Sequence, residues 1–210
     1  MIGVKICGLN EPAAFDAAIE SRADWVGFVF FPPSPRYLTP RQAYQLSSRA
    51  PSNPPRVGLF VRPTLEEISR TLEEVHLDVI QLYGVEDFTA MREKFGGEIW
   101  RAVGVESGLD LPMVVENEVD RLVVEAKPPA GATRPGGNAA TFEWQITKDW
   151  SPPSPWILAG GLDIGNVGEA IALSGATAVD VSSGVETSVG VKSPKLIRAF
   201  ILSAKGTGSA

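Results

Sequence analysis

Eight short apolar runs alternate with helix-forming segments along the whole chain, and this alternation constrains the fold more than any other feature. Within each run the apolar residues are continuous rather than placed at every second position, which is typical of strands in a parallel sheet covered on both faces. Since eight parallel strands close into a barrel, the pattern predicts an α/β protein built as a single (β/α)8 TIM barrel. The runs lie at residues 3–9, 25–30, 57–61, 79–84, 99–104, 122–126, 156–161 and 178–184.

Two segments between the predicted strands depart from the regular alternation. Residues 106–118 show weak periodicity, so the fifth helix is expected to be short or missing. Residues 127–141 are rich in proline, glycine and alanine and are expected to form a long loop. The barrel domain is predicted to span residues 1–204, with a flexible C-terminal tail at 205–210 that offers little to pack against a core.

Composition argues against several classes of partner. The chain has 19 basic and 25 acidic residues, a net charge of -6 and no basic block, so no nucleic acid is expected to bind. Its apolar runs are too short to cross a bilayer, its start lacks the layout of a signal peptide, and its single cysteine excludes an internal disulfide. We therefore expect a cytoplasmic protein without a membrane partner, either a monomer or a homodimer.

The carboxyl ends of the predicted strands carry most of the residues that could do chemistry. In a barrel all of these ends face one mouth, so residues far apart in the sequence meet there. His76, the single histidine, precedes the fourth strand and is expected at the opposite end without a catalytic role. The candidates at the mouth are Cys7, Arg36, Gln81, Tyr83, Arg101, Glu125, Gly160, Gly161, Asp180, Ser182, Ser183 and Gly184.

Cys7 ends the first strand immediately before a glycine turn. This position favours a reactive thiol at the mouth of the barrel, although a lone cysteine can also serve as a small buried hydrophobic residue. Lys5 lies on the same face of the strand but one layer lower, so it is not expected to supply a positive charge to Cys7 directly.

Two carboxyl groups are expected to reach the same mouth. Glu125 ends an otherwise apolar strand, so burial should raise its pKa toward the range of a general acid. The alternative is an ion pair with Lys127, two residues on. Asp180 alternates with valines and should point into the mouth, where it could bind a hydroxyl or an amine or only brace a neighbouring loop.

Local groups could hold an anion despite the negative net charge. Gly160 and Gly161 after the seventh strand, and residues 182–184 after the eighth, leave backbone N–H groups uncovered where barrels bind phosphate. The alternative is that these glycines only form tight turns. Arg36 follows a proline-stiffened loop and suits a planar carboxylate, unless it is a solvated loop residue.

These stretches resemble the phosphoribosylanthranilate isomerase family over nearly the whole chain. The first and the last of the matching stretches are the most specific. They are residues 4–9 (VKICGL), 33–36 (PSPR), 57–61 (VGLFV), 81–84 (QLYG), 158–162 (LAGGL) and 179–186 (VDVSSGVE).

The resemblance implies an enzyme of tryptophan biosynthesis that converts N-(5-phosphoribosyl)anthranilate into 1-(2-carboxyphenylamino)-1-deoxyribulose 5-phosphate by an Amadori rearrangement. It implies Cys7 as general base and Glu125 as general acid, with neither a metal nor an organic cofactor. The small-molecule phosphosugar-anthranilate substrate would be bound by Arg36, Gln81 and Asp180, and its phosphate by Gly160, Gly161, Ser182, Ser183 and Gly184.

The sequence departs from the family pattern at three places. The general acid is usually aspartate, whereas Glu125 is one methylene longer. The histidine of the usual Gln-Leu-His-Gly is Tyr83, and the family's Gly-Gly-Thr/Ser-Gly-Lys-Thr-Phe loop reads GGNAATF at residues 136–142. Two alternatives therefore stay open: a catalytically weak or inactive barrel homologue that binds a phosphosugar or anthranilate-like anion, and a related aldose-ketose isomerase with a different aglycone.

Overall fold

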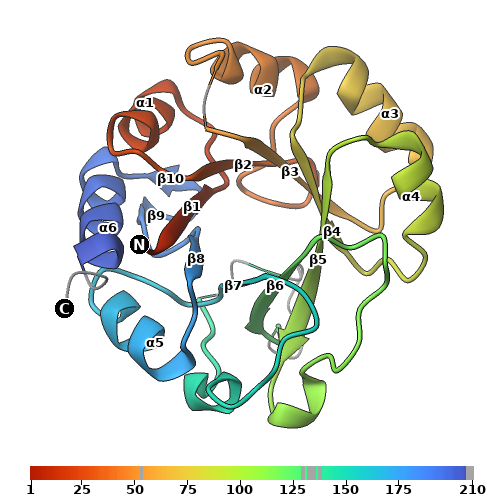
Figure 1. Ribbon diagram of the computed structural model, residues 1–210. Helices are drawn as coiled ribbons and strands as arrows, with labels where there is room; N and C mark the ends of the chain where they lie inside the picture. The colour runs from red at the N-terminus through yellow and green to blue at the C-terminus, as the bar shows by residue number, and fades with distance from the viewer. Residues whose placement is uncertain (53, 129–130, 132–135, 137–138, 207–210) are drawn as a thin grey trace.

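The computed structural model describes residues 1–52, 54–128, 131, 136 and 139–206. Its centre is a closed parallel barrel in which each strand pairs with the next and β8 pairs back with β1 (Figure 1). The predicted (β/α)8 architecture is therefore confirmed. The strands are β1 (Gly3–Cys7), β2 (Trp25–Val29), β3 (Arg56–Val61), β4 (Val79–Tyr83), β5 (Glu98–Val105), β6 (Arg121–Ala126), β7 (Trp156–Leu158) and β8 (Ala178–Val181).

The α-helices form a ring outside the barrel (Figure 1). Two short 3-10 helices, η1 (Gly108–Asp110) and η2 (Trp144–Thr147), stand where α-helices would follow β5 and β6. The expected short or missing fifth helix is confirmed, and the position after β6 is reduced in the same way. The α-helices are α1 (Pro12–Glu20), α2 (Pro40–Ser47), α3 (Leu65–Glu74), α4 (Thr89–Lys94), α5 (Val167–Ser174) and α6 (Pro194–Gly206).

Local sequence fixes where α2 and α3 begin. Thr39 and Thr64 each accept a hydrogen bond from the backbone N–H three residues on, at Gln42 and Glu67. The side chains of Gln42 and Glu67 in turn accept from the backbone N–H of the threonine. These capping boxes satisfy N–H groups that a helix start would leave without a partner.

The C-terminal region differs from the prediction in two ways. α6 continues through Gly206, beyond the predicted end of the barrel at residue 204, and Lys205 on its last turn pairs with Asp24 at 2.9 Å. The rest of the predicted tail, residues 207–210, lies outside the described residues. Between β8 and α6 lies an antiparallel hairpin of β9 (Glu186–Ser188) and β10 (Val191–Lys192), which is not among the predicted strands.

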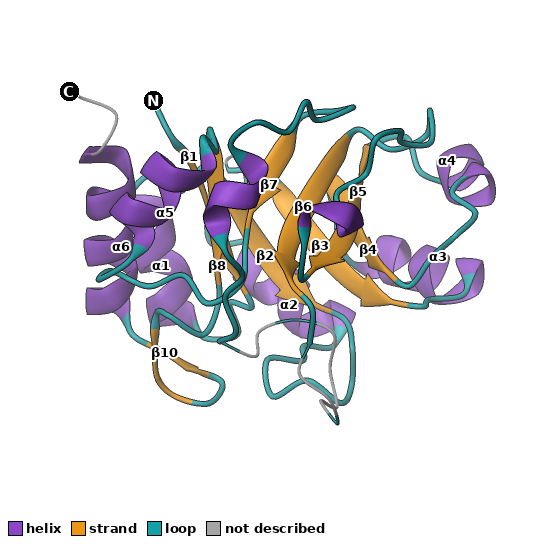
Figure 2. Ribbon diagram, turned by 90° about the horizontal axis from the view of Figure 1, so that it is seen from below, coloured by secondary structure: helices purple, strands orange, loops and turns teal. Residues whose placement is uncertain are grey.

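Aromatic side chains close the amino-terminal end of the barrel. Trp25 and Trp100 meet edge to face, with ring centroids 5.5 Å apart, and the guanidinium of Arg121 lies 5.3 Å from each ring. Around them, valine, isoleucine and alanine side chains fill the barrel interior. The opposite end carries the loops that follow the strands, including the hairpin with β10, at the lower edge of Figure 2.

No helix in the described ranges is both long and apolar enough to cross a membrane. Among the same residues, no group of three or more His, Cys, Asp or Glu side chains could hold a metal ion. His76 lies beside Asp78 before β4, at the end of the barrel where the sequence places it.

Candidate active site

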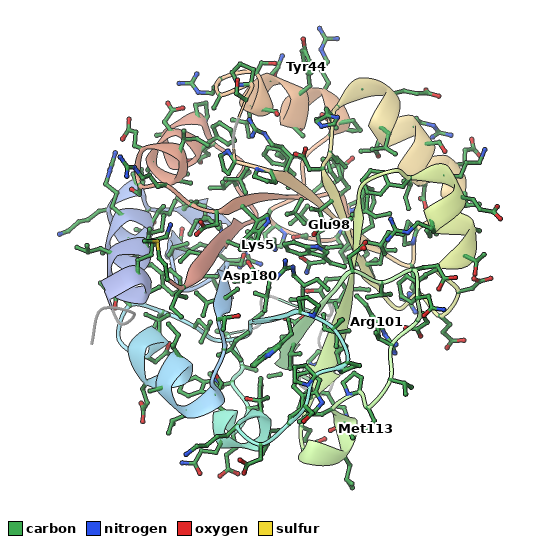
Figure 3. All side chains as sticks on the ribbon, viewed as in Figure 1. Lys5, Tyr44, Glu98, Arg101, Met113 and Asp180 are labelled. Atoms are coloured by element: carbon green, nitrogen blue, oxygen red, sulfur yellow. The ribbon has the colours of Figure 1, made fainter. Side chains whose placement is uncertain are left out.

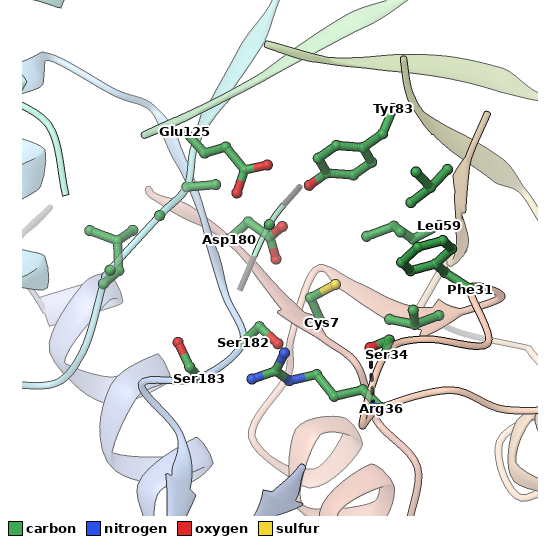
Figure 4. A pocket seen from close by; sticks show the side chains of 17 residues that line it. Cys7, Phe31, Ser34, Arg36, Leu59, Tyr83, Glu125, Asp180, Ser182 and Ser183 are labelled. Atoms are coloured by element: carbon green, nitrogen blue, oxygen red, sulfur yellow. Dashed lines mark hydrogen bonds between the residues drawn. The ribbon is translucent and has the colours of Figure 1, made fainter. Parts of the chain in front are cut away.

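A pocket opens at the carboxyl ends of the strands and collects side chains from both halves of the chain. Cys7 of β1, Tyr83 of β4, Glu125 of β6 and Asp180 of β8 all line it (Figure 4). Arg36 reaches it from the loop after β2. The glycines and serines predicted to hold phosphate, Gly160, Gly161, Ser182 and Ser183, also line it.

Three of the residues collected from the strand ends lie elsewhere. Gln81 is fully buried and is not among the residues that line the pocket. Gly184 packs against the loop after β7, where an added Cβ would lie 1.9 Å from the carbonyl oxygen of Leu162. Arg101 pairs with Glu116 at 2.8 Å and lies on the outer side of the barrel, beside β5, in Figure 3.

Cys7 is surrounded by buried charge. Its side chain is only 5% exposed, and burial raises the pKa of the thiol. Lys5, whose ammonium lies 2.8 Å from Asp180, opposes this rise chiefly through its charge. The expectation that Lys5 would not reach Cys7 is therefore wrong, because a lysine side chain is long enough to span one layer of the barrel.

Glu125 has the environment of a general acid. Burial raises the pKa of its carboxyl to about 7, although a hydrogen bond from Tyr83 lowers it in part. The alternative ion pair does not form, because Lys127 pairs with Asp110 at 2.6 Å. Near neutral pH, Glu125 can therefore both hold and release a proton.

Tyr83 connects Glu125 to the buried amide of Gln81. The Nε2 atom of Gln81 donates to the Tyr83 hydroxyl oxygen at 3.2 Å. Gly136 covers the pair, since a Cβ there would lie 2.9 Å from both carboxylate oxygens of Glu125 and 3.0 Å from the tyrosine oxygen. Of the loop at 136–142 that departs from the family pattern, Gly137 and Asn138 lie outside the described residues.

Arg36 is buried and fixed, contrary to a solvated loop arginine. Its Nε and Nη2 atoms donate to the two carboxylate oxygens of Glu186 at 2.6 and 2.9 Å. Lys192 pairs with the same carboxylate at 3.0 Å and donates to the backbone carbonyl of Ser182. Burial would raise the pKa of Glu186, but the hydrogen bond from Arg36 and the charge of Lys192 lower it to about 2.

Glu186 and Lys192 are not among the site residues predicted from the sequence. Glu186 is the last residue of the stretch 179–186 that resembles the family, and Lys192 lies in a hairpin whose sequence shows no strand periodicity. Burial lowers the pKa of Lys192 to about 8, so its ammonium group begins to lose its proton at mildly alkaline pH. The ion pair between Glu186 and Lys192 could be predicted only if the pairing of the two hairpin strands were known.

The two glycines after β7 adopt backbone conformations that favour glycine. Gly160 has φ +86° and Gly161 φ +63°, and a Cβ on Gly161 would lie 2.4 Å from Thr141. The carbonyl of Gly161 accepts a hydrogen bond from Asn166, which does not line the pocket. Asn166 occupies the N-cap position of α5.

A sequence model of the N-(5'phosphoribosyl)anthranilate (PRA) isomerase family matches residues 4–203 of the chain. The chain belongs to this family. The N-(5'-phosphoribosyl)anthranilate isomerase of Acidiphilium cryptum is 49% identical over 205 residues, which cover 97% of this chain and 98% of that protein. The isomerase of Paramagnetospirillum magneticum is 46% identical over 210 residues and covers 98% of each.

Solved phosphoribosylanthranilate isomerases share the fold over nearly the whole length. A structure of monomers derived from the dimeric isomerase of Thermotoga maritima gives a TM-score of 0.84 at 35% identity and covers 98% of this chain and 100% of that one. A second isomerase, solved with reduced 1-(o-carboxyphenylamino)-1-deoxyribulose 5-phosphate, gives 0.82 at 33% identity with the same coverage. The isomerase family and its place in tryptophan biosynthesis, expected from the motifs, are confirmed at the level of the family.

Proposed function

We propose that this chain catalyses the Amadori rearrangement of N-(5'-phosphoribosyl)anthranilate, with Glu125 as general acid and Cys7 as general base. The observation that carries the proposal is the arrangement of the pocket. A carboxyl group with a pKa of about 7 and a thiol, from β6 and β1, line the same cavity beside two glycine- and serine-bearing loops (Figure 4). This arrangement suits a sugar phosphate that needs protonation at one atom and deprotonation at another.

In the first step Glu125 donates its proton to the ring oxygen of the ribose. The bond between C1 and this oxygen breaks, and the lone pair of the anthranilate nitrogen forms a Schiff base with C1. Because the pKa of Glu125 is raised to about 7, a useful fraction of the carboxyl is protonated near neutral pH.

In the second step the Cys7 thiolate removes the proton from C2 of the open sugar. The electron pair of the C–H bond forms a double bond between C1 and C2, and the Schiff base nitrogen recovers its lone pair. The resulting enolamine becomes the ketone as C1 gains a proton and the C2 hydroxyl loses one. Lys5 and Lys192 both favour the thiolate that this step requires.

The remaining pocket residues would hold the substrate at its two ends. Gly160, Gly161, Ser182 and Ser183 would bind the phosphate, and Arg36 the anthranilate carboxylate. Arg36 uses Nε and Nη2 for Glu186, which leaves Nη1 for this contact. Asp180 would accept from a sugar hydroxyl, since its Oδ1 atom is buried and has no hydrogen-bond partner among the described residues.

Two substitutions test the assigned roles. Cys7→Ala and Glu125→Gln should each lower kcat by about 100-fold or more, the usual contribution of a positioned acid or base. Retention of the fold is checked by circular dichroism and thermal unfolding. A variant that turns over at the rate of the parent removes the role of that residue, and growth of a tryptophan auxotroph lacking the isomerase tests the reaction itself.

A binding protein without turnover is the second candidate. It is favoured by the position of Glu125, whose longer side chain is hydrogen-bonded to Tyr83 and covered by Gly136. Tight binding of reduced 1-(o-carboxyphenylamino)-1-deoxyribulose 5-phosphate, without measurable turnover by the parent or by Glu125→Asp, would decide for this candidate. The third candidate is a related aldose-ketose isomerase with another aglycone, and an Arg36→Ala variant tests it. If this candidate is correct, the substitution should leave selectivity for the anthranilate carboxylate unchanged.

A further inference from the structure

Lys5 is a fully buried lysine on β1 with no contact to substrate in the proposed reaction. It lies near the axis of the barrel beside Asp180, as Figure 3 shows. Burying an ammonium group is costly unless it is paired, so a lysine at this position needs a local reason. The structure supplies two partners, Asp180 and Cys7.

A glycine in the neighbouring strand, Gly27, leaves space in which Lys5 and Cys7 can come together. The two residues point to the same face of β1, and Cys7 lies opposite Gly27 of β2 in the sheet register. A Cβ on Gly27 would lie 3.1 Å from the Cys7 sulfur and 3.4 Å from the Cε atom of Lys5. The end of the lysine side chain and the sulfur thus border the same small space, which any side chain on Gly27 would crowd.

Asp180 holds the other side of the ammonium. It lies opposite Lys5 in the pairing of β1 with β8, and its Oδ2 atom is 2.8 Å from Nζ. Although burial opposes the charged form, the charges of Asp180 and of the Cys7 thiolate raise the pKa of Lys5. Lys5 is therefore a permanent cation between a fixed carboxylate and the sulfur.

We propose that Lys5 is the positioning residue of Cys7, and that its ammonium, tethered by Asp180, orients the sulfur and favours the thiolate. This inference rests on the proposed function only for its consequence in catalysis, because it concerns the ionisation of the thiol itself. Without the cation, a thiolate in this pocket would lie beside the carboxylate of Asp180 with no tethered positive partner.

The sign of the effect follows from all groups that face the sulfur. Burial raises the pKa of Cys7 and the charge of Asp180 adds to the rise, while Lys5 and Lys192 oppose it. The charge of Lys5 lowers the pKa of the thiol more than the charge of Lys192 does. The groups that interact with the sulfur are Lys5 from β1, Tyr83 from β4, Asp180 from β8 and Lys192 from β10. Glu125 from β6 and Arg36 from the loop after β2 line the same pocket.

The single cysteine allows a direct test. The pH titration of the thiolate ultraviolet absorbance, with Cys7→Ser as the blank for the tyrosines, reports the pKa of Cys7 without any substrate. Since Lys5→Met would leave Asp180 buried without its partner, Lys5→Met/Asp180→Asn is compared with Asp180→Asn alone. Loss of the cation should raise the pKa by about one unit or more, and alkylation by iodoacetamide at a fixed pH below it should slow about tenfold.

Lys192→Met is the matched comparison, because it removes a second buried cation whose charge lowers the pKa of Cys7 less than the charge of Lys5 does. It should shift the titration less than the loss of Lys5 does. Equal titrations for Asp180→Asn and the double variant, or a larger shift for Lys192→Met, would overturn the proposal.

A measurement on the unaltered lysine covers the case in which the double variant does not fold. In protein carrying carbon-13 lysine, the Cε resonance of Lys5 should move with the titration of Cys7 and lose that step in Cys7→Ser; a resonance insensitive to Cys7 contradicts the proposal. In the isomerase assay, the loss of Lys5 should lower kcat more than it raises KM, with a shifted pH profile. An inactive parent protein with an intact Lys5 effect on the thiol would refute the proposed function alone.

Discussion

Arg36 and Glu186 form a buried pair with two parallel hydrogen bonds, 2.6 Å from Nε and 2.9 Å from Nη2, although 150 residues separate them in the sequence. Lys192 contacts the same carboxylate at 3.0 Å. The pair joins the loop after β2 to the hairpin after β8. The guanidinium is therefore held in place before a ligand enters the pocket, which reduces the side-chain entropy lost on binding.

Removing the carboxylate should destabilise the fold. Glu186→Gln leaves two buried cations without their anion and should lower the free energy of unfolding by about 3–5 kcal/mol. The pKa of Glu186 is about 2 in the folded protein against an ordinary 4.5, so its contribution is present above about pH 4.5 and lost as the pH falls through 2. Urea unfolding at several pH values measures both effects.

Glu66→Gln is the control for that experiment, because Glu66 pairs with Arg70 on the exposed face of α3. It should change stability by less than about 1 kcal/mol. Equal effects of the two substitutions would contradict a special role for the buried pair.

The raised pKa of Glu125 predicts the opposite pH dependence. Its folded value of about 7 lies above the ordinary 4.5, so this residue contributes stability below pH 4.5 that is lost as the pH rises through 7. Glu125→Gln carries no such titration. Relative to the parent, the variant should gain up to about 3 kcal/mol between pH 4 and pH 8, measured by denaturant unfolding. A difference that does not vary with pH would show that the carboxyl titrates normally.

Tyr83 should tune the proposed acid. Its hydrogen bond lowers the pKa of Glu125, so Tyr83→Phe should raise that pKa and move the alkaline limb of kcat/KM upward by about one pH unit. The pH profile of the isomerase reaction is the measurement. Tyr44→Phe, on an exposed part of α2, serves as the control and should leave the profile in place. If the pH profile of Tyr83→Phe coincides with that of Tyr44→Phe, the Tyr83 hydroxyl has no effect on the pKa of Glu125.

Gly161, in the loop after β7, should be intolerant of any side chain. Gly161→Ala places a Cβ 2.4 Å from Thr141 at a positive φ, so it should raise KM about tenfold or more by displacing the proposed phosphate cradle. Gly165→Ala, four residues on, meets only one side-chain oxygen at 3.3 Å and is the matched control. Inorganic phosphate should compete with substrate in the control, and a Gly161→Ala enzyme of equal KM would remove the loop from phosphate binding.

The sequence predicted the architecture because every strand is a continuous apolar run, a signal that depends only on local residue order. It also found Cys7, Glu125 and Asp180, since a strand end in a barrel has one direction to face. Layering along the strand was harder to use. The side chain of Gln81 remains in the layer of the barrel interior below Tyr83, whereas the longer side chain of Lys5 reaches the layer of Cys7. The alternation of side-chain directions along a strand does not distinguish these two cases.

Glu186 was beyond such reasoning for another reason. It starts a two-stranded hairpin whose strands are too short to show a period, and its partners Arg36 and Lys192 lie at very different distances along the chain. Hydrogen bonding between distant loops depends on how the barrel closes. That information is carried by the packing of the whole chain and by no single motif.

The cluster of Trp25, Arg121 and Trp100 leaves the barrel open at one end only, because it closes the end opposite the pocket. Substrate and product must then enter and leave through the same opening of the pocket. A bound product molecule therefore prevents the next substrate from binding. Turnover of this enzyme should accordingly be slowed by its own product in a purely competitive manner.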